Sequence, residues 1–197
     1  ETVMVEPGRT GASNAKRRGL RHVICATTET AGFQPGSLPA AGLFDVLEHV
    51  KDDAAFLESI RHLMIQGGRL YLTVPAYSWL WAAKDVLAGH FRRYTLADIC
   101  AVVRAAGFEI EFSSYLFRFL PVPIFLLRTI PYRLGLSRPD QKGGRVFKDH
   151  AAGGGMAEAA FSRLMDILSK SELANLDHKK PMCFGSSCLV VARVSKT

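Results

Sequence analysis

The chain has 197 residues, 48% of them hydrophobic and 22% charged, a balance typical of one folded domain with a real core and not of a disordered segment. The formal charge of +7 would suit nucleic acid, but the basic residues lie in short, dispersed clusters without interleaved aromatics, so we expect a solvated surface and no nucleic-acid partner. Four cysteines without a zinc spacing indicate reduced thiols, a cytoplasmic protein and no bound metal.

The first part of the chain predicts two short strands around a helix. Residues 2–5 favour a strand that Pro7 and Gly8 terminate. A weak helix over residues 12–18 ends at Gly19, and residues 21–26 predict a second buried strand. Because the chain enters the first strand without an initiating methionine, we expect further residues upstream.

The clearest unit begins with a third buried strand over residues 43–47, in which Phe44, Val46 and Leu47 are expected to pack. A helix follows from Asp52 and Asp53, whose negative charges suit a helix N-terminus. Its apolar positions repeat every 3.6 residues up to a stop at 67–68 (Phe56, Leu57, Ile60, Leu63 and Met64). Residues 69–74 then predict a strand that ends at Pro75.

The second half continues the alternation of strands and helices. Thr95 and Asp98 form a capping box for a helix that runs to residue 106 and stops at Gly107. Strands over 108–115 and 187–194 follow. The alternation predicts an α/β fold with a parallel sheet and helices on both faces. We treat residues 1–197 as a single domain, with 116–180 as an insertion or lid before the last strand.

Within this insertion, residues 116–136 are apolar but contain three prolines and three arginines. Their uncharged span, 119–127, has about half the length that crosses a bilayer, so we expect no transmembrane helix. Packing against the core, a lid over a greasy substrate and a shallow membrane-surface contact all stay open. Residues 141–155 predict a mobile glycine-rich loop, and 156–170 predict a helix.

Residues 42–50 (Gly-Leu-Phe-Asp-Val-Leu-Glu-His-Val), the helix after them and the Gly-Gly-Arg-Leu of 67–70 resemble the second half of a class I S-adenosylmethionine-dependent methyltransferase of the small-molecule kind. The resemblance implies a Rossmann-like fold with an antiparallel C-terminal strand, S-adenosyl-L-methionine as cofactor, and methyl transfer to a small molecule by in-line displacement. The family's first strand and Gly-x-Gly loop have no counterpart in this sequence. We therefore expect that strand to be missing from the sheet and this segment alone to bind the cofactor poorly.

Candidate cofactor residues lie at strand ends, where open α/β sheets bind ligands. Glu6 follows the first strand, and an acid there can accept both ribose hydroxyls; a solvent-facing strand end is the alternative. The resemblance assigns the ribose to Glu6, the adenine to Thr27 and Thr28, and the methionine side to Asp45 and Glu48. Asp45 in an apolar strand would need a hydrogen-bond partner, so it is either a satisfied structural acid or part of the cofactor site.

His49 and His90 are the candidate catalytic residues, since an acceptor that carries a proton needs a base. A helix-capping role is the alternative for His49. The loop around His90 carries the pattern Asp-x4-His-x-Arg-Arg-Tyr-Thr, which the resemblance includes. Its arginines suit a carboxylate or phosphate on the acceptor, and its aromatics can exclude water, which makes four substrate-binding candidates: Trp81, Arg92, Arg93 and Tyr94. A loop pinned by ion pairs is the alternative.

Two other functions stay open. One is a NAD- or nucleotide-binding Rossmann protein, because dehydrogenases also place an acid after a strand. The other is a non-catalytic methyltransferase-like module that contacts a membrane surface through residues 116–136. For the methyltransferase we expect an acidic or lipophilic small-molecule acceptor and a peripheral membrane contact. That interpretation requires Glu6, residues 48–49 and residues 90–94 to converge on one rim of one sheet.

Overall fold

The computed structural model describes residues 2–137 and 168–195. The predicted loop over 141–155 and most of the predicted helix over 156–170 lie outside these residues, although 168–177 are helical. In chain order the named elements are β1 (Val3–Val5), α1 (Arg9–Arg17), β2 (His22–Ile24), β3 (Leu38–Phe44), η1 (Leu47–His49), α2 (Asp53–Leu63), β4 (Met64–Pro75), η2 (Ser78–Leu80), α3 (Ala83–Ala88), α4 (Leu96–Ala105), β5 (Phe108–Leu116), α5 (Pro121–Ile124), η3 (Phe125–Thr129), α6 (Ile130–Arg133) and β6 (Ser187–Val194).

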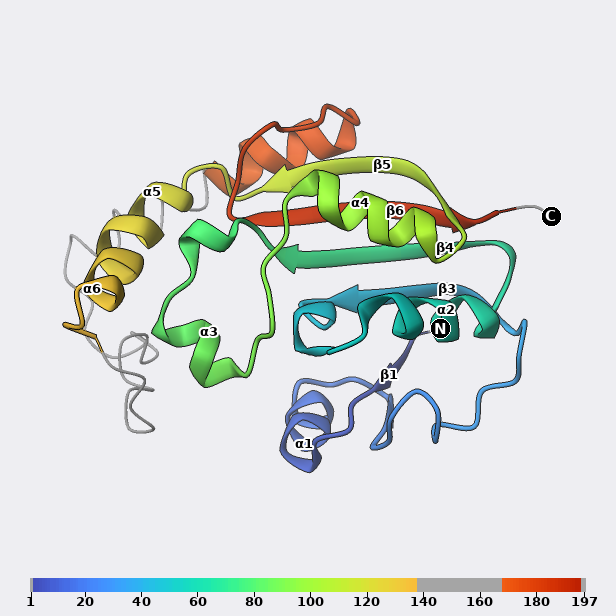
Figure 1. Cartoon of the computed structure of the whole chain (residues 1–197). Coiled ribbons are helices and arrows are strands. Elements are labelled where there is room, and N and C mark those ends of the chain that lie inside the picture. Colours follow the sequence, from blue (N-terminus) through green and yellow to red (C-terminus); the bar gives the residue numbers. More distant parts are fainter. Residues whose placement is uncertain (1, 138–167, 196–197) are drawn as a thin grey trace.

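The strands form two separate sheets. β1 pairs with β2 in parallel, and a second sheet has the order β3-β4-β6-β5. In that second sheet β3 and β4 are parallel, whereas β6 runs antiparallel to both of its neighbours. The predicted α/β fold with an antiparallel last strand is therefore confirmed (Figure 1). β1 and β3 each have one edge without a partner among the described residues, which agrees with a strand missing between them.

Helices α2 and α4 lie side by side against the four-stranded sheet (Figure 1). Side chains of β4 alternate between buried and exposed, as a strand with one covered face requires. Leu70, Leu72 and Val74 are fully buried in the core with Leu57 of α2. Phe44, which we expected to pack, is 62% exposed because it follows the buried Leu43 and so points to the other face.

Two predicted boundaries differ from the structure. β3 covers Leu38–Phe44 and not 43–47, because Asp45 adopts a left-handed φ of 52° and ends the strand. α2 ends at Leu63 and β4 begins at the next residue, so the glycine pair at 67–68 lies inside a strand. A Cβ on Gly68 would lie 2.9 Å from the carbonyl oxygen of Ile65, so glycine permits a close approach of backbone here and does not stop the helix.

Residues 117–136 form a short helical arm, made of α5, η3 and α6, that packs on the chain after β4. Thr129 is buried and donates a hydrogen bond to the Leu80 carbonyl at 3.1 Å, and the Phe125 ring meets Trp79 edge to face. The outer side of the arm is apolar and exposed, with Leu127 76% accessible. No helix of the described residues is long and apolar enough to cross a membrane. All four cysteines are free, as predicted.

Candidate active site

The end of β3 positions Glu48 and His49. After the strand, the Asp45 amide donates to the Thr73 carbonyl of β4 at 3.0 Å, and the left-handed φ of Asp45 turns the chain into η1. Leu47 is fully buried and anchors η1 in the core. The next two side chains differ in exposure: Glu48 is 1% accessible, whereas His49 is exposed. This strand end therefore presents one buried carboxylate and one accessible imidazole.

Residues 77–93 form the second part of the site, as a loop whose two ends meet at the end of β4. An isolated parallel bridge pairs Ala76 with Tyr94. The Tyr94 amide donates to the Pro75 carbonyl at 3.1 Å, and the Tyr77 amide donates to the Tyr94 carbonyl at 2.8 Å. The loop also reaches η1, since the Phe91 amide donates to the Glu48 carbonyl at 2.7 Å. His90 is thereby brought next to Glu48.

Asp85 is the central acceptor of this loop and is 1% exposed. It accepts hydrogen bonds from Arg93 Nε at 2.7 Å and Nη2 at 3.1 Å, and from the Ala82 amide at 2.9 Å. His90 Nδ1 lies 2.9 Å from the same carboxylate. The third guanidinium nitrogen of Arg93, Nη1, donates to the Ala76 carbonyl at 3.0 Å. A buried charge network therefore fixes the ring of His90 and turns its Nε2 toward Glu48.

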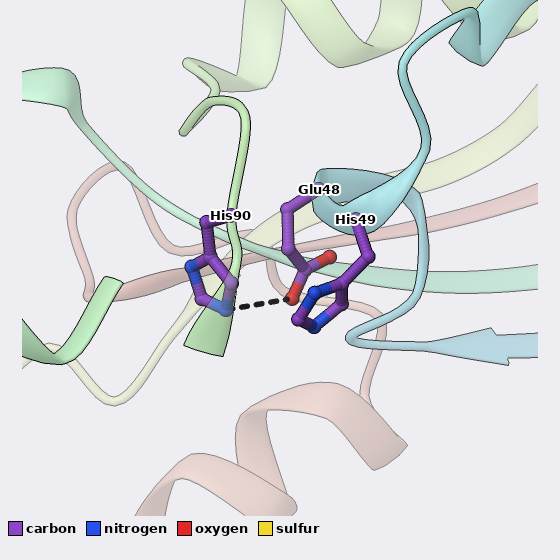
Figure 2. Close-up of side chains that lie close together, drawn as sticks. All are labelled: Glu48, His49 and His90. Atoms are coloured by element: carbon purple, nitrogen blue, oxygen red, sulfur yellow. Dashed lines mark ion pairs between the residues drawn. The ribbon is translucent and has the colours of Figure 1, made fainter. Parts of the chain in front are cut away.

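Glu48, His49 and His90 meet at the carboxyl end of β3 (Figure 2). His90 Nε2 lies 4.0 Å from Glu48 Oε1, and the two imidazole rings meet edge to face at 4.6 Å between centroids. Glu48 Oε2 has no hydrogen-bond partner. Burial raises the pKa of Glu48 to about 7, and the nearby Asp45 and Asp85 carboxylates also raise it. Burial lowers the pKa of His90 despite the opposing effect of Asp85.

The structure favours the loop pinned by ion pairs over an arginine fork that is free to bind an acceptor. All three nitrogens of the Arg93 guanidinium are engaged, two by Asp85 and one by the Ala76 carbonyl. Arg92 pairs with Asp53 at 2.8 Å and donates to the Lys51 carbonyl at 2.5 Å. The Tyr94 hydroxyl donates to Asp53 at 2.9 Å, and Tyr94 is only 4% exposed. These side chains hold the loop in place.

The aromatic side chains of this loop gather in a different group from the one we predicted. Trp81 is half-buried, directly after η2. The larger aromatic group is centred on Tyr77, whose ring stacks on Trp79 at 5.4 Å and on Tyr115 at 5.1 Å. Burial raises the pKa of Tyr77, so its hydroxyl stays neutral. Sequence patterns give little warning of this stack, because Tyr115 belongs to β5 and meets the loop only in the folded sheet.

The predicted cofactor residues are spread over two sheets. Glu6 follows β1 and accepts a hydrogen bond from the Gly8 amide at 2.8 Å. Its carboxylate lies against the first turn of α1, where a Cβ on Gly11 would come within 2.6 Å of it. Half-buried at a strand end with one oxygen free of that bond, Glu6 fits a ribose diol. Within residues 2–137, Glu6 makes no hydrogen bond or ion pair to Glu48 or His49, so two of the three expected groups meet directly.

The remaining cofactor candidates lie in turns. Thr27 follows β2, and its amide donates to the Thr30 hydroxyl at 3.1 Å within a local turn; Thr28 beside it is half-buried. Asp45 is exposed and does not lie in an apolar strand, which corrects the prediction. Its carboxylate accepts a weak hydrogen bond from the Thr73 hydroxyl at 3.3 Å. Asp45 thus has one hydrogen-bond partner and lies near enough to Glu48 to act on its charge.

The chain is similar in sequence to a known domain family. The sequence profile of the family described as "Methyltransferase domain" matches residues 9–111, just over half of the chain. The match runs from α1 into the first part of β5, so it includes η1 and the whole loop from 77 to 93. No curated protein matches the chain.

Solved structures share the fold at low identity. An S-adenosylmethionine-dependent methyltransferase of Thermotoga maritima, described as a "possible histamine N-methyltransferase", has a TM-score of 0.56 and 16% identity over 99% of this chain and 73% of its own. A methyltransferase of Mesorhizobium loti gives 0.52 and 14%, over 96% and 78%. A complex of the Haloferax volcanii Trm112 methyltransferase activator with a methyltransferase gives 0.56 and 12%, over 98% and 71%. Identities this low speak for the fold alone.

Proposed function

The chain belongs to the S-adenosylmethionine-dependent methyltransferase family, and on this premise we propose that it methylates a small-molecule acceptor at the site formed by η1 and the loop 77–93. The observation that carries the proposal is the meeting of Glu48, His49 and His90 at the carboxyl end of β3. Ligands of open α/β sheets bind at this edge. The four free thiols support a cytoplasmic location.

Residues on the β1 side of this edge suit the cofactor that the family uses. When bound, S-adenosylmethionine supplies an electrophilic methyl group on sulfur. Glu6 would accept the ribose hydroxyls, with Thr27 and Thr28 beside the adenine. Asp45 and Glu48 would border the methionine end.

The protein's own residues position the acceptor and handle its proton. Alignment of two reactants at near-contact distance can lower the barrier by several kcal/mol. An acceptor hydroxyl or ammonium must also lose a proton, and a neutral imidazole near pH 7 is suited to take it. His49 is accessible and takes this proton. His90, held by Asp85, orients the His49 ring through their edge-to-face contact at 4.6 Å.

The aromatic side chains support a small, partly apolar acceptor. Tyr77, Trp79 and Trp81 lie in the same loop as His90, and Tyr77 and Trp79 form an aromatic stack there that an apolar part of the acceptor would contact. Arg92 keeps 35% of its side chain exposed and is the remaining candidate to meet a negative group of the acceptor.

Calorimetric titration with S-adenosylhomocysteine and with NAD tests the cofactor assignment. We expect heat from S-adenosylhomocysteine only, with weak affinity, and its loss in Glu6→Gln. Glu58→Gln, an exposed acid on α2, is the matched control. Binding of NAD in place of S-adenosylhomocysteine would overturn the proposal in favour of a dinucleotide-binding protein.

Formation of S-adenosylhomocysteine in the presence of phenol, catechol, amine and carboxylate acceptors tests the reaction. With a productive acceptor, His49→Gln should lower kcat by about 10²-fold or more, since general bases contribute 10²–10⁴. The exposed His178→Gln should leave kcat unchanged. Equal rates for wild type and His49→Gln would show that His49 does not take the proton.

A further inference from the structure

The side chains of Glu48, His49 and His90 are a set of metal ligands, and the proposed methyl transfer does not by itself require a metal. Each offers one ligand atom, and the three atoms lie within 4.8 Å of one another (Figure 2). We propose that these three residues bind a divalent first-row transition cation such as Mn²⁺, Fe²⁺, Co²⁺ or Zn²⁺.

The first support is the unpaired oxygen of Glu48. A buried carboxylate oxygen without a partner costs free energy, because it has lost water and gained nothing. Glu48 is 1% exposed, and its Oε2 has no partner. Figure 2 shows the carboxylate between the two imidazole rings, with Oε1 turned toward His90. A cation bound by both oxygens of this carboxylate would satisfy Oε2 as well.

The second support is the arrangement behind His90. Histidines that bind metals usually donate their other ring nitrogen to a carboxylate, which fixes the ring and its tautomer. His90 has this arrangement: Nδ1 lies 2.9 Å from Asp85, and Nε2 is left facing Glu48. Asp85 is held in turn by Arg93 and the Ala82 amide. His90 therefore has the supporting carboxylate that is typical of a metal-binding histidine.

Charge and geometry also suit a cation. Negative charge dominates around Glu48: its own carboxylate and those of Asp45 and Asp85 are opposed by the guanidinium of Arg93. Metal–nitrogen and metal–oxygen bonds of about 2.1 Å place neighbouring ligand atoms about 3 Å apart, so the cluster must contract. His49 is exposed and Glu48 Oε2 is unbonded, so both can move toward the fixed His90.

The donor set selects the class of cation. Two imidazoles and one carboxylate favour borderline transition metals over Mg²⁺ and Ca²⁺, which prefer oxygen ligands. Three protein ligands also leave coordination positions open. A cation here would bind an acceptor oxygen and favour its deprotonated form; His49 would then be a ligand of the cation, and it would act as the base only in the cation-free protein. That use rests on the proposed function, whereas cation binding itself does not.

Electron paramagnetic resonance of Mn²⁺ titrated into the chelator-treated protein, without cofactor or acceptor, tests the site. Mn²⁺ binds thiols poorly, so the exposed cysteines do not interfere. We expect one bound Mn²⁺ per chain. Its affinity should fall at least tenfold in His49→Gln and in Glu48→Gln, and should be unchanged in the control variants His178→Gln and Glu58→Gln.

Asp85→Asn is the sharper variant, because Asp85 touches His90 and not the cation. Loss of such a supporting carboxylate costs about 10–100-fold in affinity. Absence of Mn²⁺ binding at millimolar concentration, or equal affinity in wild type and the folded surface variant His49→Gln, would overturn the assignment. Mn²⁺ binding without S-adenosylhomocysteine binding would count against the proposed function and leave the metal site standing.

Discussion

Replacing Asp85 with asparagine should strongly destabilise the protein. The carboxylate is 1% exposed and is surrounded by four donors: Arg93 Nε and Nη2, the Ala82 amide and His90 Nδ1. Asparagine keeps one acceptor oxygen, but it removes the charge and turns an N–H group toward a donor. The Arg93 guanidinium, whose side chain is 11% exposed, would stay buried without a counter-charge.

Breaking a buried ion pair by removing one partner costs about 3–5 kcal/mol. Arg93 keeps its hydrogen bond to the Ala76 carbonyl, so we expect the lower end, about 3 kcal/mol. In urea unfolding with a slope near 2 kcal/mol/M, this loss lowers the midpoint by about 1.5 M. A domain of ordinary stability, about 5–15 kcal/mol, would remain folded in water.

The matched control is Glu111→Gln, which removes the partner of Arg69 on the sheet surface. That pair is 2.9 Å long, with the Arg69 side chain 58% exposed, so its loss should cost about 0–1 kcal/mol. Nitrogen NMR titration of the histidines gives an independent measure. Asp85 raises the pKa of His90 against burial, so that pKa should fall further in Asp85→Asn. Equal stability losses in the two variants, with an unmoved His90, would refute the reasoning.

Other predictions concern single groups. The pKa of Glu48 is raised from 4.5 to about 7 in the folded protein, so its contribution to stability is present below pH 4.5 and is lost as pH rises through 7. In chelator-treated protein, the free energy of unfolding of Glu48→Gln should therefore exceed that of wild type by about 1–3 kcal/mol between pH 5 and 8. Urea unfolding measures this difference. Burial raises the pKa of Cys188 to about 12, so a maleimide should label Cys25 and Cys183 in the folded protein and Cys188 only after unfolding, as read by peptide mass spectrometry. The exposed apolar arm should sediment with phosphatidylserine vesicles, and Leu127→Asp should reduce the bound fraction; wild-type protein that stays in the supernatant would dismiss the membrane contact.

Local signals predicted the elements that depend on local chemistry. The capping box of α4 is present as expected, with the Asp98 amide donating to the Thr95 hydroxyl at 3.2 Å and Gly107 in a left-handed turn. β6 matches its predicted residues. The first five residues of β3, 38–42, were missed because Pro39 and Gly42 are poor strand residues. Pairing with β4 stabilises the strand there, and that pairing is set by the sheet and not by the sequence nearby.

The site was predictable to the extent that it follows from topology. Glu48 and His90 both follow parallel strands, and the carboxyl ends of such strands meet at one edge. The partners of Arg92 and Arg93 were not predictable, because they depend on the path of a loop without periodicity. Asp85 was visible in the sequence as part of the pattern before His90, but its central place in the network emerges only from the folded loop.

The bridge between Ala76 and Tyr94 has an evolutionary consequence. It holds the two ends of residues 77–93 together just beyond β4, so this loop can be exchanged as a unit. Insertions or deletions near its tip leave the alignment of the strands untouched. If related enzymes differ in the acceptor they prefer, we therefore expect their sequences to differ first in this loop, while the strands of the sheet stay the same.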